Sequence, residues 1–113
     1  IMDDIRGRAQ HIAQQTRTTI EIVDLSRNPS ALASPDVQRV IERAAGKLSL
    51  GSMRLPSGAG HDAQMMAQLS PMGMIFVPSV AGISHSPKEL THWEDCANGA
   101  NMLLQTELEM DAL

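Results

Sequence analysis

The sequence has few aromatic residues and no surplus of positive charge. Phe76 and Trp93 are its aromatic residues, tyrosine is absent, and the formal net charge is -4. A nucleic-acid interface draws on basic side chains for phosphates and often on aromatic rings for base stacking, so we expect no nucleic-acid partner. No run of about 18 apolar residues occurs, and we therefore expect no membrane span.

Cysteine is also scarce, because Cys96 is the only one. A single thiol excludes an internal disulfide and a thiolate zinc cluster, and it fits a reducing compartment. Residues 1–4 carry no basic leader and no apolar segment follows them, so we expect a cytoplasmic protein. Cys96 falls in the middle of a predicted helix and is expected to be a small buried hydrophobe rather than a nucleophile.

Apolar residues make up 42% of the 113 residues, enough for the core of one domain or of part of a larger one. An amphipathic pattern typical of a helix is present from the first residue, at Ile1, Ile5, Ala9 and Ile12. We expect this helix to end near Gln15 and to begin upstream of Ile1. The pattern thus predicts that the chain is part of a longer protein.

Signals for a strand, a linker and a second helix follow in that order. The β-branched segment 18–25 predicts a strand, and the turn-rich segment 26–31 predicts a linker between two structural units. Ser34, Pro35 and Asp36 then supply an N-cap, a proline at the first helical position and an acid in the first turn. The helix that they begin has apolar residues at helical spacing, namely Val37, Val40, Ile41, Ala44, Ala45 and Leu48.

Two short apolar segments later in the chain predict further strands. Residues 53–55 end at Pro56 and lead into a glycine turn and a short helix reaching about Met66. Residues 73–77 form an uninterrupted apolar run, typical of a central parallel strand covered on both faces. A capping box at 86–89 predicts the start of the last helix. Its apolar side is expected to carry Leu90, Trp93, Ala97, Ala100, Leu104 and Leu108. This alternation predicts an α/β fold with right-handed crossovers.

Two histidines follow predicted strands, at the edge where open α/β sheets hold ligands. A lone histidine there is more often structural, but His61 and His85 on one rim favour a functional site. His85 directly precedes the helix cap, and a rigidly held imidazole suits a metal ligand; the alternative is a loop histidine bonded to a neighbour. Glycine permits a positive φ and close backbone approach, so the amides of Gly58, Ala59 and Gly60 could face an anionic group.

The nearby carboxylates do not complete a zinc site. Asp62 fits a helix cap and Glu89 fits the capping box, whereas a catalytic zinc needs about three protein ligands. Most of any metal site therefore lies elsewhere. The sequence also lacks a serine-hydrolase elbow, a phosphate loop and a dinucleotide fingerprint.

Three motifs together resemble a known family. They are Pro-Ser-Gly-Ala-Gly-His-Asp-Ala at 56–63, Met-Ile-Phe-Val-Pro-Ser at 74–79 and Gly-Ile-Ser-His-Ser-Pro-Lys-Glu at 82–89. The chain is similar over nearly its whole length to the C-terminal part of N-carbamoyl-L-amino-acid and allantoate amidohydrolases. These are di-zinc, aminopeptidase-like amidases.

The resemblance implies a division of the chain into parts of two domains. Residues 1–32 would be the last helix and strand of an α+β lid that also forms a homodimer. Residues 33–113 would be the C-terminal part of a three-layer α/β/α catalytic domain of the zinc-aminopeptidase type.

The resemblance also assigns roles to the candidate residues. His85 matches the family's final metal ligand, for zinc with manganese or cobalt as alternatives, and His61 matches a histidine lining the substrate pocket. Gly58, Ala59 and Gly60 match the turn whose backbone meets the substrate carboxylate. The other metal ligands, the general-base glutamate and further substrate-binding residues would lie upstream, so this chain alone is expected to be inactive.

The reaction implied is hydrolysis of the ureido C–N bond of an N-carbamoyl-L-amino acid or of allantoate by a zinc-activated water. Ammonia, carbon dioxide and an amino acid would be the products. Two alternatives stay open at this point. One is a peptidase or aminoacylase of the same superfamily, and the other is a domain that associates without performing chemistry.

Overall fold

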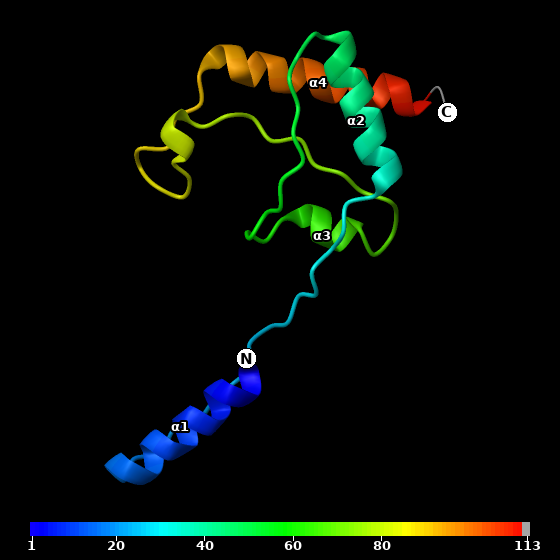
Figure 1. The fold of residues 1–113 in the computed structure, drawn as a ribbon. Coiled ribbons are helices and arrows are strands. Elements are labelled where there is room, and N and C mark those ends of the chain that lie inside the picture. The colour runs from blue at the N-terminus through cyan, green and yellow to red at the C-terminus, as the bar shows by residue number, and fades with distance from the viewer. Residues whose placement is uncertain (112–113) are drawn as a thin grey trace.

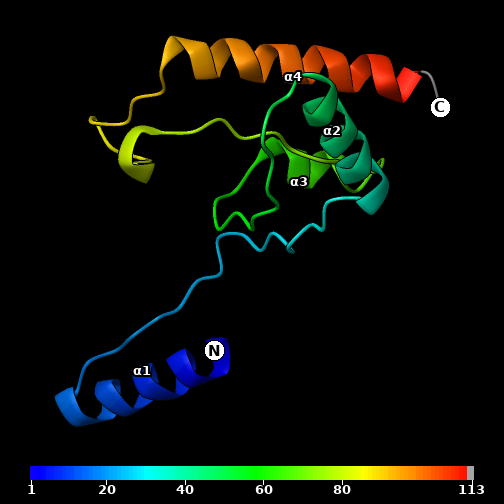
Figure 2. The same ribbon diagram turned by 45° about the horizontal axis from the view of Figure 1, so that its top comes forward.

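The computed structural model describes residues 1–111. The molecule is elongated, with dimensions of 64, 34 and 18 Å along its principal axes. Its helices are α1 (Met2–Thr16), α2 (Pro35–Lys47), α3 (Asp62–Met66) and α4 (Trp93–Asp111), with a single 3₁₀ turn, η1, at Val80–Gly82. Helix α1 stands apart from α2, α3 and α4 and is joined to them by the extended segment 17–34 (Figures 1 and 2).

The predicted α/β fold is wrong, because residues 1–111 contain helices and no strand. Neither the three-layer α/β/α arrangement nor the lid strand forms among these residues. A strand exists only when a neighbouring segment completes its backbone hydrogen bonds, and the predicted strands 18–25, 53–55 and 73–77 have no such neighbour among them. They run as irregular extended chain instead. In segment 18–25 the side chains stay in solvent, with Val23 63% and Leu25 92% exposed.

Helix α2 forms where its sequence predicts. Pro35 occupies the first helical position, and Ser34 caps the helix through its backbone, since its carbonyl accepts from the Gln38 N–H at 2.9 Å. The Ser34 N–H donates to the Met72 carbonyl at 2.7 Å and so ties the helix start to the segment before 73–77. The buried residues of α2 are Val37, Val40, Ala44 and Ala45.

Helix α4 begins at Trp93, later than the capping box predicts. Residues 86–89 form one closed turn, in which the Glu89 N–H donates to the Ser86 carbonyl at 2.9 Å. The Glu89 carboxylate accepts from the His85 N–H at 2.7 Å, one residue before the expected partner. The motif therefore closes a loop rather than starting the helix.

The face of α4 that packs on α2 is not the predicted apolar side. Met102 and Thr106 are buried there, whereas Trp93 is 89% exposed and Leu104 57% exposed. Cys96 is exposed as well, so the prediction of a buried thiol is wrong. Small residues on α2 explain why this face of α4 packs there, because Ala44 and Ala45 leave room for the long Met102 side chain.

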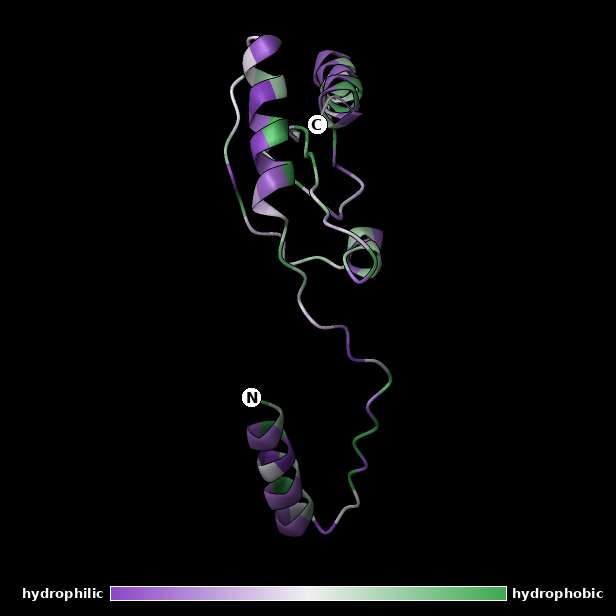
Figure 3. Cartoon of the chain, turned by 90° about the vertical axis from the view of Figure 1, so that its right-hand side faces the viewer, coloured by the Kyte–Doolittle hydropathy of each residue, from purple (hydrophilic) through white to green (hydrophobic). Residues whose placement is uncertain are grey.

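The core is small and lies between α2 and α4. Ala44, Ala45 and Met102 form its buried centre, and the half-buried residues around it are Ile41, Leu48, Leu50 and Ile75. Helix α1 buries no residue, and Figure 3 shows it as mostly hydrophilic. Among the described residues, no helix combines the length and the apolar character needed to cross a membrane.

Candidate functional site

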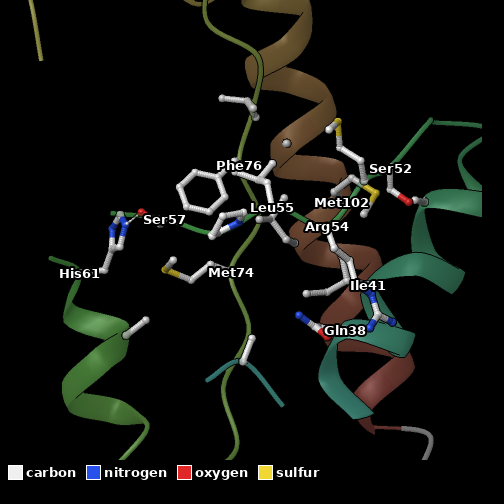
Figure 4. Close-up of a pocket in the computed structure, with 18 of the residues that line it drawn as sticks. Gln38, Ile41, Ser52, Arg54, Leu55, Ser57, His61, Met74, Phe76 and Met102 are labelled. Atoms are coloured by element: carbon white, nitrogen blue, oxygen red, sulfur yellow. Dashed lines mark hydrogen bonds between the residues drawn. The ribbon is translucent and has the colours of Figure 1, made fainter. Parts of the chain in front are cut away.

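His61 lies at the start of α3, and two neighbours hold its imidazole (Figure 4). The Ser57 Oγ is 2.7 Å from the His61 Nε2. The ring meets Phe76 edge-on, with centroids 5.7 Å apart and an angle of 71° between the planes. A hydrogen bond at one edge and an aromatic contact on the ring together define both its position and its tilt.

The glycine turn before His61 is open to solvent. A Cβ atom built on Gly58 would meet nothing within 4 Å, and one on Gly60 would meet only the Gln64 Oε1 at 3.6 Å. Neither glycine has a positive φ, so the conformational freedom anticipated for them is not used. The Ala59 N–H donates to the Ser57 Oγ at 3.3 Å. Of the three predicted anion-binding amides, the one on Ala59 is thus already engaged.

Gln64 secures the backbone around His61. Its Oε1 accepts from the His61 N–H at 3.1 Å, while its own N–H donates to the His61 carbonyl at 2.9 Å. The Gln64 Nε2 also donates to the Pro29 carbonyl at 3.4 Å. These bonds connect the histidine turn to the linker that follows segment 18–25.

His61 borders a cavity of about 1100 Å³ between α2, α4 and the extended segments. Apolar side chains dominate the wall that Figure 4 shows, including Leu55, Met74 and Phe76. Ala59 and Ser57 also line this cavity, so the histidine, its hydrogen-bond partner and part of the glycine turn share one wall.

Arg54 brings charge to the same wall. Its Nε lies 2.6 Å from the Glu42 Oε1 and its terminal nitrogen 3.0 Å from the Glu42 Oε2, a two-pronged pair with α2. The hydrogen bond from Arg54 lowers the pKa of Glu42 below its usual value of 4.5. The pair anchors the extended segment that leads to Ser57.

His85 sits in a separate loop and does not line the cavity. The Val80 N–H donates to the Leu90 carbonyl at 2.8 Å and closes this loop at its base. His85 is exposed and has a left-handed φ of 54°, held by the Glu89 carboxylate on its N–H. The structure therefore holds the ring of His61 and the backbone of His85, but it does not bring the two histidines into one wall.

The described residues do not assemble a metal centre by themselves. Among residues 1–111, no three side chains of histidine, cysteine, aspartate or glutamate gather closely enough to hold an ion. Since a catalytic zinc needs about three protein ligands, His85 alone does not meet the requirement.

Three residues of the site were missed from the sequence. Ser57 lies within the glycine motif, four residues before His61, and that spacing across a turn is a usable signal for a side-chain hydrogen bond. Phe76 was assigned only to a strand, and Arg54 was not considered at all. Their contacts bridge distant parts of the chain, so sequence spacing does not indicate them.

Comparison with known proteins places the chain in a family. Residues 5–108 match the model for Peptidase family M20/M25/M40, and the chain belongs to this family. Enzymes of this family are typically metal-dependent. The chain is similar to an N-carbamoyl-L-amino acid amidohydrolase and to an allantoate amidohydrolase, which confirms the resemblance found in the motifs.

Three relatives illustrate the similarity. An N-carbamoyl-L-amino acid amidohydrolase of Geobacillus stearothermophilus is 41% identical over 102 residues, covering 90% of this chain and 25% of that protein. A ureidoglycolate hydrolase of Arabidopsis thaliana is 36% identical over 107 residues, or 94% and 22% of the two chains. An allantoate amidohydrolase of Escherichia coli K12 is 55% identical over 47 residues, or 42% and 11%. The chain thus spans about a quarter of the length of the first two relatives.

Proposed function

We propose that this chain contributes to an amidohydrolase that cleaves the ureido C–N bond of N-carbamoyl-L-amino acids or of allantoate. The carrying observation is the fixed imidazole of His61 at the wall of a largely apolar cavity, with the open backbone of Gly58 and Gly60 in the turn that precedes it. The names of the similar proteins support the ureido class of substrate.

The glycine turn supplies the substrate-binding step of this proposal. Within residues 1–111 the N–H groups of Gly58 and Gly60 make no hydrogen bond, so both are available to a substrate carboxylate. Fixed backbone dipoles need little reorganisation when an anion arrives. His61 would contact the same substrate from the side of the cavity, and Ala59 would hold the turn in shape through Ser57.

His85 is proposed as a ligand of a divalent metal, zinc or alternatively manganese or cobalt. Its backbone is restrained on both sides, which suits a ligand whose direction must be fixed. The remaining ligands and the general base would come from parts of the protein outside this chain. When bound, the metal would polarise the ureido carbonyl and activate water.

The domain assignment is part of the same proposal. Residues 1–32 would belong to a lid that pairs two subunits, and residues 33–113 to the catalytic domain of a cytoplasmic enzyme. The separation of α1 from the helices α2–α4 supports such a boundary near the linker (Figure 1).

Ammonia release tests the reaction. The complete gene product that carries this chain is incubated with zinc or manganese and a panel of N-carbamoyl-L-amino acids and allantoate, with the 113-residue chain as control. Release by the complete protein alone supports the ureido reaction and identifies the substrate branch. No release from a zinc-loaded protein contradicts it and favours peptides or acylated amino acids.

Metal content distinguishes the roles proposed for His85 and His61. In the complete protein, His85→Ala should lose one metal equivalent and nearly all turnover, whereas His61→Ala should keep its metal and turn over more slowly. His92→Ala, an exposed histidine two residues beyond Leu90, serves as the control and should match the wild type. Unchanged metal in His85→Ala contradicts the ligand role, and metal loss in His61→Ala contradicts the pocket role.

A further inference from the structure

We propose that Ser57 is a positioning residue for His61, which its hydroxyl holds in one orientation and one tautomer. The local geometry carries this inference, and only the effect on turnover rests on the function proposed above for His61. The bond joins the Ser57 Oγ and the His61 Nε2 at 2.7 Å, a distance typical of a well-formed hydrogen bond.

Gln64 holds the backbone of His61, whereas Ser57 holds its ring. The Gln64 N–H donates to the His61 carbonyl at 2.9 Å, and the Gln64 Oε1 accepts from the His61 N–H at 3.1 Å. A neutral imidazole carries its one N–H on either Nδ1 or Nε2. The Ser57 Oγ engages Nε2, and this bond favours one of the two tautomers over the other.

Ser57 is itself held in place. Its Oγ accepts from the Ala59 N–H at 3.3 Å and lies 2.7 Å from the His61 Nε2, so hydrogen bonds to two different groups hold the hydroxyl. Three residues earlier, the two bonds from Arg54 to Glu42 fix the segment to α2. The orientation of His61 is thereby linked to a helix rather than to a free loop.

Phe76 limits the motion that the hydrogen bond leaves. Its edge-on contact with the imidazole would survive loss of the hydroxyl, but one aromatic contact does not distinguish the two tautomers. Without Ser57 the ring is expected to keep its neighbourhood and lose its fixed tautomer. Because the position of the ring and its tautomer would respond differently, the role of the hydroxyl can be measured.

Nitrogen NMR of the imidazole in the complete protein that carries this chain tests the proposal without any need for activity. In the wild type, the His61 nitrogens should show a single tautomer at a pH where the ring is neutral. Ser57→Ala should give signals averaged between the tautomers, and Ser57→Thr, which keeps a hydroxyl, should restore the wild-type signals. Ser52→Ala, in the same extended segment, is the matched control. An unchanged His61 signal in Ser57→Ala overturns the proposal.

Kinetics of the complete protein give the second arm. Ser57→Ala should lower kcat/KM by roughly 10-fold, mainly through kcat, with metal content unchanged and with recovery in Ser57→Thr. If the NMR signals change but the kinetic constants do not, Ser57 positions His61 as proposed, and the substrate role of His61 is what fails. If both arms match the wild type, the positioning role is wrong.

Discussion

Gly99 of α4 lies so close to Val77 that a Cβ atom built on the glycine would be 2.5 Å from the Val77 Cγ1. Carbon atoms that are not bonded normally stay about 3.5–4.0 Å apart. The helix therefore approaches the extended segment 73–77 only because position 99 has no side chain. This contact sets the distance between α4 and the segment that carries Phe76.

Gly99→Ala should be about 1–3 kcal/mol less stable than Gly46→Ala, because both variants gain the helix preference of alanine but only the methyl group at position 99 forces Val77 or the helix to move. Urea unfolding followed by the helical circular dichroism signal measures the change. Gly46→Ala in α2 is the matched control, since nothing lies within 4 Å of the place its methyl group would take and alanine favours helix by up to about 1 kcal/mol. Adding Val77→Ala should rescue Gly99→Ala, and equal stability of Gly99→Ala and Gly46→Ala would contradict the packing.

Acid should weaken the contact between α2 and α4. Lys47 forms an ion pair with Glu109, and Arg43 lies 3.5 Å from the same carboxylate, across the helix contact. The hydrogen bond from Lys47 lowers the pKa of Glu109 below its usual value of 4.5. A carboxyl group whose pKa is lowered by folding stabilises the fold above the unfolded pKa, and the stabilisation is lost as the pH falls through the folded pKa.

The free energy of unfolding should therefore decrease below about pH 4.5, the usual value for glutamate. Glu109→Gln should be less stable than the wild type at neutral pH and should lose less stability on acidification. Urea midpoints measured between neutral and acidic pH give the comparison, with Glu107→Gln on an exposed site of the same helix as control. Identical pH profiles for Glu109→Gln and wild type would refute the role of this ion pair.

The helices were predictable where local signals and burial agree. Pro35 at the first position and the apolar spacing of Val37, Val40 and Ala44 define α2 without reference to the rest of the molecule. The absence of strands was not predictable, because segment 73–77 has the composition of a buried strand. Its conformation depends on a pairing segment that residues 1–111 do not provide.

Only the part of the candidate site that lies within one sequence motif was predictable. The motif identified His61 and the glycine turn, and the structure places part of that turn and His61 on one cavity wall. The Phe76 contact joins residues fifteen positions apart in sequence and depends on the tertiary path of the chain. The left-handed φ at His85 could not be predicted either, since it follows from the closed loop around this residue.

Arg54→Lys should loosen the segment that leads to Ser57. Lysine keeps the charge but cannot form the two parallel bonds that the guanidinium makes with Glu42. Backbone ¹⁵N relaxation should show greater motion at residues 52–57 in this variant. Arg39→Lys is the control, because its partner Asp36 lies in the same helix and the exchange touches no other segment. Equal motion in the two variants would show that the ion pair does not anchor the segment.

The exposed side of α4 should make the chain associate with itself at high concentration. Leu104 and Leu108 are 57% and 58% exposed, and Trp93 on the same helix is 89% exposed. Contiguous apolar side chains at a surface favour association because contact removes them from water. The double variant with Leu104→Lys and Leu108→Lys should shift sedimentation toward the monomer, while Glu107→Lys, which alters charge between them, should not. Sedimentation velocity over a roughly hundredfold concentration range measures the shift, and a wild-type monomer at every concentration would disprove the association.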